Sequence, residues 1–191
     1  MSPKYFQQIA IRPRDRTMST PHEELLHDFQ QFAITAPTAK SLMERISHGL
    51  HEKMTRYNWA GFYIVDPTDP DILLVGPFVG SFTPNARIPL HTGLCGAAAR
   101  DAQTIVVHDV TKDPRYLAGS PLVKSEIVVP IFAHKQLAGE LDIESYFTGT
   151  FTPAEQQFVE ACATTVAKYL EKTRAGLSES SPAIAAGGRP R

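Results

Sequence analysis

Two stretches near the N-terminus repeat apolar residues at helical spacing. In residues 22–34 the apolar positions recur every three or four residues: Leu25, Leu26, Phe29, Phe32 and Ala33. That period predicts an amphipathic helix. In residues 38–54, Leu42, Ile46 and Leu50 share one face, and Thr38 is a suitable cap for a second helix.

The pattern then changes to short runs of aromatic and β-branched residues, which are typical of strands. We predict five of them: residues 58–66, 72–80, 104–110, 125–134 and 136–145. A turn over residues 67–71 joins the first two as a hairpin, and a tight turn at Lys135 joins the last two. Residues 81–93 read as irregular and residues 94–102 as a short helix.

A last helix is predicted over residues 152–173, with Thr152 as cap, Pro153 in the first turn and Glu155 in the capping-box position. Hairpins between helices at both chain ends predict an α/β fold of the α+β type, in which helices pack on an antiparallel sheet. The sequence has no βαβ alternation, no GxGxxG and no GxxxxGK[ST], so we expect no nucleotide cofactor.

A length of 191 residues suits one domain. We expect a flexible arm over residues 1–20, one domain over residues 21–174, and a disordered Ser-, Ala-, Gly- and Pro-rich tail over residues 175–191. Met18 begins a stretch that resembles a natural protein start. The residues before it are therefore either an upstream extension or a loosely ordered arm.

Composition and charge exclude several partners. The chain carries 19 basic and 20 acidic residues, a net charge of −1, which offers no basic surface to nucleic acid or to an anionic membrane. No apolar run approaches the ~20 residues of a membrane helix. We therefore expect a cytoplasmic protein without a nucleic-acid or membrane partner. With two cysteines, no disulfide scaffold is expected.

Alternation along the first strand places Trp59, Gly61 and Tyr63 on one face. A glycine between two aromatic residues leaves a gap that could hold a small ligand. The alternative is that Trp59 and Tyr63 are core residues under a helix.

Acidic residues gather on one face of the last two strands. Asp142 and Glu144 alternate with apolar neighbours, and the turn at Lys135 sets Glu126 roughly opposite Glu144, subject to a bulge at Pro130. Such a cluster must reach water, hold protons or bind a cation. Either it lines a pocket for a compact cation such as an α-ammonium group, or it is a solvated sheet edge.

Cys95 lies at a Gly-flanked turn that leads into the predicted helix at residues 94–102. A helix N-terminus lowers a thiol pKa, and Arg87 and His91 could assist, so Cys95 is a candidate nucleophile. The alternative is a buried, inert cysteine, which we expect for Cys162 on the apolar side of the last helix. The histidines are scattered and have no cysteine partners at zinc-finger spacing, so we expect no metal site.

Six short segments, in order, resemble the GAF-domain free methionine-(R)-sulfoxide reductases. They are residues 58–63 (NWAGFY), 76–78 (GPF), 87–89 (RIP), 93–98 (GLCGAA), 125–130 (SEIVVP) and 139–145 (GELDIES). The similarity spans roughly residues 25–172.

The resemblance implies an antiparallel GAF sheet of about six strands, a homodimer, and a pocket for free methionine-(R)-sulfoxide. The substrate-binding positions that it implies are Trp59, Tyr63, Glu126, Asp142 and Glu144. The last of these is usually an aspartate in the family.

The same resemblance implies three cysteines, of which this chain keeps only Cys95. Asn85 stands at the first family position, and Gly119 at the last, which is the catalytic one. The chain is then either a one-cysteine reductase, with Cys95 resolved by thioredoxin or a small thiol, or a GAF module that binds an amino-acid-like ligand and acts through a partner protein. A cyclic-nucleotide or bilin ligand fits poorly, because carboxylates repel anions.

Overall fold

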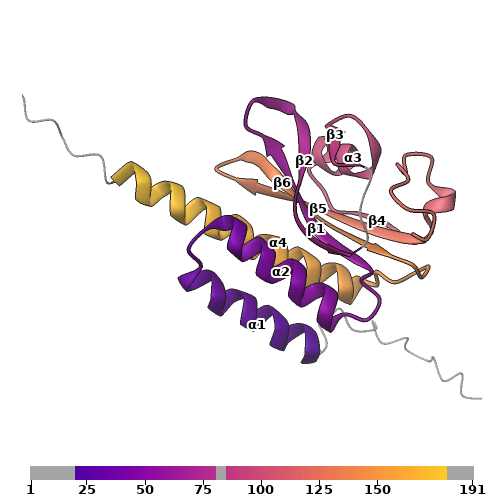
Figure 1. Cartoon of the computed structure of the whole chain (residues 1–191), viewed down its shortest axis with the longest axis horizontal. Coiled ribbons are helices and arrows are strands. Elements are labelled where there is room, and N and C mark those ends of the chain that lie inside the picture. The colour runs from indigo at the N-terminus through magenta and orange to yellow at the C-terminus, as the bar shows by residue number, and fades with distance from the viewer. Residues whose placement is uncertain (1–19, 81–84, 180–191) are drawn as a thin grey trace, which may run out of the picture.

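The computed structural model describes residues 20–80 and 85–179 (Figure 1). Nearly all of the arm predicted over residues 1–20 and most of the tail predicted over residues 175–191 lie outside this part of the chain; Thr20 already belongs to the first helix. No helix within the described ranges is long and apolar enough to cross a bilayer.

A six-stranded sheet forms the centre of the domain, in the order β3-β2-β1-β6-β5-β4. Its strands are β1 Trp59–Asp66, β2 Asp69–Gly80, β3 Arg87–Pro89, β4 Ile105–Val107, β5 Ser125–Ala133 and β6 Gln136–Ser145. Every pairing is antiparallel, which confirms the predicted fold class. Strand β3 lies where we predicted an irregular segment, and the turn before β2 is shorter than predicted because Asp69 already pairs with Asp66.

The hairpin of β5 and β6 fixes the position of the acidic residues. His134 and Lys135 adopt left-handed backbone conformations and close the tight turn predicted there. The resulting register pairs Glu126 with Glu144, as predicted. The irregularity falls between Ile131 and Phe132, beyond the predicted position at Pro130, and so leaves the Glu126–Glu144 pairing undisturbed.

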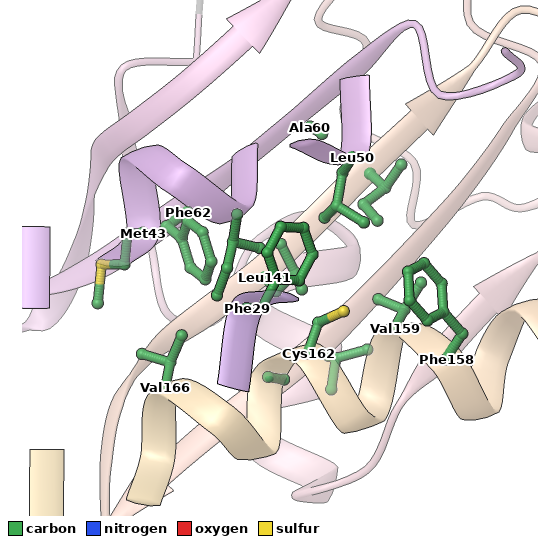
Figure 2. Packing of buried hydrophobic residues seen from close by; sticks show 14 of the residues in the cluster. Phe29, Met43, Leu50, Ala60, Phe62, Leu141, Phe158, Val159, Cys162 and Val166 are labelled. Carbon is green, nitrogen blue, oxygen red and sulfur yellow. The ribbon is translucent and has the colours of Figure 1, made fainter. Parts of the chain in front are cut away.

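Helices α1 Thr20–Thr35, α2 Ala39–Lys53 and α4 Pro153–Glu179 cover one face of the sheet (Figure 1). Side chains from β1 and β6, among them Phe62 and Leu141, meet Phe29 of α1 and Cys162 of α4 in a continuous apolar core (Figure 2). Cys162 is fully buried there, as predicted.

Both predicted threonine caps form, but Glu155 does not close the predicted capping box, because its carboxylate accepts from the Tyr57 hydroxyl and contacts His22. The Thr38 hydroxyl accepts a hydrogen bond from the Ser41 backbone N–H at 3.0 Å, and the Thr152 hydroxyl accepts one from Glu155 at 3.3 Å. Helix α4 runs to Glu179, six residues past its predicted end at residue 173.

A core substitution tests this packing. Phe29→Ala should lower the free energy of unfolding by about 3–5 kcal/mol, because Phe29 is fully buried and its removal leaves a cavity. Leu122→Ala, at a side chain that is 56% exposed, should change it by less than about 0.5 kcal/mol. Urea denaturation of both variants measures the difference, and equal effects would contradict the placement of Phe29.

Candidate functional site

The second face of the sheet is covered by helix α3 Gly93–Asp101 and the loops beside it (Figure 1). A separate buried cluster fills this side and includes Trp59, Tyr63, Leu94 and Cys95. The two faces of β1 therefore belong to different buried clusters. Its even-numbered residues pack under the long helices, and its odd-numbered residues face α3.

Four carboxyl groups lie on this second face. The register pairs Glu126 with Glu144 across β5 and β6, and it pairs Gly61 with Asp142 and Tyr63 with Glu140 across β1 and β6. These side chains do not form a solvated edge. Glu126, Asp142 and Glu140 are 6%, 4% and 0% exposed, and Glu144 is partly buried.

Glu140 is the acidic residue that the sequence analysis missed. It lies two residues before Asp142, so the strand alternation that grouped Asp142 with Glu144 also places Glu140 on their face. Neither of its carboxyl oxygens has a hydrogen-bond partner in the described chain other than the weak donor Cys95 Sγ–H. One oxygen of Asp142 is also unpartnered among the described residues.

The carboxyl groups have no cation to offset their burial. Within residues 20–80 and 85–179, no lysine, arginine or histidine forms an ion pair with any of the four. Burial, followed by repulsion from neighbouring carboxylates, raises the pKa of Glu126 and of Asp142 well above the ordinary values. Burial raises the pKa of Glu140 to about 8 and that of Glu144 to about 7. These raised pKa values favour the protonated forms of Glu126, Asp142 and Glu140 near neutral pH.

Cys95 is the third residue of α3 and lies against these acids. Gly96 allows α3 to pack closely against the loop before it, since a Cβ there would lie 2.7 Å from the Leu90 carbonyl oxygen. We predicted a lowered thiol pKa from the helix N-terminus, and this was wrong. Burial and the acids Glu140, Asp142 and Glu126 raise the pKa of Cys95 well above its ordinary value, which outweighs the helix.

The two basic residues expected to assist Cys95 do not do so. The Arg87 guanidinium donates to the Asp66 carboxylate at 3.0 Å, at the sheet edge formed by β2 and β3. The His91 side chain is exposed to solvent.

A small pocket joins the predicted site residues. Cys95, Tyr63 and the carboxyl groups of Glu126, Asp142 and Glu144 line it, and its other lining residues are Asn85, Ile88, Thr92, Gly93, Leu94 and Leu117. Its volume is about 20 Å³, enough for one water molecule. A free amino acid would require the pocket to widen.

Trp59 lies behind this pocket and does not line it. Its indole is 2% exposed and packs between Phe78 and Tyr63, with ring centroids 5.5 Å and 6.1 Å away. The gap predicted at Gly61 is filled, because a Cβ there would lie 2.4 Å from the Phe78 Cβ and 2.7 Å from the Trp59 ring. Tyr63 is the predicted aromatic residue that reaches the pocket.

Hydrogen bonds at the rim of the pocket connect the loop at Asn85 with the loop at Leu117. The Tyr63 hydroxyl donates to the Asn85 carbonyl oxygen at 3.0 Å, and the Asn85 side-chain amide donates to the Leu117 carbonyl oxygen at 3.3 Å. Asn85 thus lies beside Cys95 in the pocket lining, and Leu117 is two residues before Gly119.

The buried acids predict an unusual pH dependence. The folded protein keeps protons that the unfolded chain has lost, so the free energy of unfolding should fall as pH rises from the ordinary carboxyl pKa of 4.5 to about 8. Glu140→Gln should reduce this slope by up to about 1.4 kcal/mol per pH unit within that window. Glu171→Gln, at an exposed position on α4, is the matched control. Urea denaturation across pH measures the slope, and an unchanged slope in Glu140→Gln would contradict the assignment.

Comparison with known proteins agrees with the geometry. The GAF domain family model matches residues 40–170. The free methionine-R-sulfoxide reductase of Escherichia coli (strain K12) is 32% identical over 152 residues, which make up 80% of this chain and 90% of that protein. GAF domain-containing protein A of Dictyostelium discoideum is 36% identical over 101 residues, 53% of this chain and 62% of that protein.

A solved structure is also similar to this chain over most of its length. The X-ray structure of free methionine-R-sulfoxide reductase from Neisseria meningitidis, in complex with its substrate, superposes with a TM-score of 0.76 at 30% identity. The match covers 81% of this chain and 91% of that one. The chain therefore belongs to the GAF-domain family, among the homologues of the free methionine-R-sulfoxide reductases.

Proposed function

We propose that this domain binds a free amino acid, methionine-(R)-sulfoxide, with its α-ammonium group among the carboxyl groups of Glu126, Asp142 and Glu144. The burial of these acids without a cationic partner carries the proposal. A compact cation with several N–H donors would stabilise the carboxylates by charge and by hydrogen bonds. A phosphate ligand would instead meet buried like charges.

The sulfoxide end of such a ligand would extend toward Tyr63 and Cys95. Both line the same pocket as the acids, and the tyrosine ring offers an apolar and polarisable surface. The lining residues Leu117 and Glu144 are at least partly exposed, so the pocket has access to solvent on that side.

Reduction would begin when the Cys95 sulfur attacks the sulfoxide sulfur. The products of this half-reaction are methionine and a Cys95 sulfenic acid, to which the sulfoxide oxygen has been transferred. A first external thiol would then displace water and form a mixed disulfide, and a second would release the Cys95 thiol. Glu140 lies beside Cys95 and, when ionised, can accept the thiol proton.

A second candidate function is ligand binding without reduction. The Cys95 thiol is buried with a raised pKa, which lowers the thiolate fraction. Cys162 cannot resolve a sulfenic acid at Cys95, because it belongs to the core on the opposite face of the sheet. On this alternative the domain senses or sequesters an amino acid and acts through a partner protein.

The oligomeric state, the location and the reductant are also part of this proposal. We expect a homodimer in the cytoplasm that needs no cofactor, with thioredoxin or a small thiol as reductant if the protein is a reductase.

Calorimetry tests the binding site. Glu126→Gln should weaken binding of methionine-(R)-sulfoxide by about 3–5 kcal/mol, the usual effect of removing one partner from a buried ion pair. The exposed-site variant Glu171→Gln should bind like the wild type. Unchanged affinity in Glu126→Gln would remove Glu126 from the site.

A reduction assay separates the two functions. We expect weak or absent turnover with thioredoxin, because no second thiol in this pocket can form the disulfide that thioredoxin reduces. Residual turnover should prefer glutathione, be lost in Cys95→Ser and persist in Cys162→Ser. Strong thioredoxin-dependent turnover that survives in Cys95→Ser would contradict both functions.

A further inference from the structure

A thiol and two carboxyl groups meet at the base of the pocket. The Cys95 Sγ and one carboxyl oxygen each from Glu126 and Asp142 all lie within 4.8 Å of one another, and all three residues are buried. We propose that these three side chains bind a thiophilic divalent cation of the zinc class when no amino acid occupies the pocket.

The geometry is close to that of a three-ligand zinc site. With metal–sulfur and metal–oxygen distances of about 2.0–2.3 Å, the ligand atoms of a tetrahedral site lie roughly 3.5 Å apart. Side-chain shifts of about 1 Å would bring the three atoms to that spacing. The fourth position would face the pocket, whose volume of about 20 Å³ accommodates one water molecule.

The unpartnered oxygens nearby are an independent observation that points to a cation. Asp142 has one buried oxygen, and the fully buried Glu140 has two, without a conventional donor in the described chain. Glu140 lies on the same face of β6 as Asp142, and its carboxyl group accepts a weak hydrogen bond from the Cys95 thiol. A buried polar atom without a partner is destabilising, and a cation at this position would offset that cost.

The thiol distinguishes a metal from the ammonium group proposed above. An ammonium accounts for buried carboxylates, but gains little from a sulfur atom among them. Thiolate is a preferred ligand of zinc and related soft cations. The sequence spacing of histidines and cysteines predicted no metal site, because Cys95, Glu126 and Asp142 are far apart in the sequence and come together only in the folded chain.

The charges of the three ligand groups determine how the metal affinity depends on pH. A thiolate and two carboxylates carry three negative charges, and a dication neutralises two of them. Thiol and carboxyl ligands bind a metal in their deprotonated forms, so binding releases their protons and affinity should rise with pH. The metal site uses the pocket of the proposed function but does not depend on reductase activity.

Cobalt(II) serves as a spectroscopic probe in the test with the full chain. We expect one Co²⁺ per chain with a sulfur-to-cobalt charge-transfer band, and we expect Zn²⁺ to displace it. The band should vanish in Cys95→Ser and persist in Cys162→Ser, the matched control cysteine. Asp142→Asn should weaken Co²⁺ binding at least about tenfold, as loss of a metal ligand or its support typically does.

Calorimetry in two buffers of different ionisation enthalpy should show proton release on Zn²⁺ binding. Near-UV circular dichroism of each metal-free variant confirms that it is folded. Absence of the charge-transfer band in the wild type, or its persistence in Cys95→Ser, would overturn the metal site.

Competition separates this proposal from the function proposed above. Methionine-(R)-sulfoxide should lower the apparent Co²⁺ affinity if both bind in one pocket. A cobalt band that Zn²⁺ abolishes but methionine-(R)-sulfoxide leaves unchanged would support the metal site and overturn the amino-acid site.

Discussion

The burial of carboxyl groups without a cation is the constraint on which the rest of this site depends. Two neighbouring strands, β5 and β6, align Glu126, Glu140, Asp142 and Glu144 on one face, and α3 covers that face. Ionised, these groups would repel one another in a region that excludes water. Protonation relieves this repulsion, and so does any ligand that brings positive charge. The raised pKa of Cys95 has the same origin, because its thiolate would add to the same buried charge.

The rest of the fold stabilises this face of the sheet but contributes no residue to the site. The long helices bury one side of the sheet in an apolar core, and a second apolar cluster surrounds the acids on the other side. A marginally stable domain can keep an unfavourable cluster of this kind only if most of its folding free energy arises elsewhere. The division also separates the two cysteines, since Cys95 belongs to the site and Cys162 to the core.

Much of the arrangement can be predicted from local sequence. Strand alternation and the two-residue turn at Lys135 are short-range features, and they suffice to place Glu126 opposite Glu144. The same alternation would have identified Glu140. Burial could not be predicted in this way, because it depends on what covers the strand. Only the folded structure shows that Cys95 of α3 is buried against the acids and that Arg87 pairs with Asp66. It also shows that Trp59 and Phe78 fill the space at Gly61.

The protonation state of the buried acids tests the central claim most directly. Carbon-13 chemical shifts of the side-chain carboxyl groups, followed through a pH titration with and without methionine-(R)-sulfoxide, report each group separately. Our account predicts that Glu126, Asp142 and Glu140 are protonated in the free protein at neutral pH, and that ligand binding ionises Glu126 and Asp142. Carboxyl groups that are already ionised at neutral pH in the free protein would contradict it.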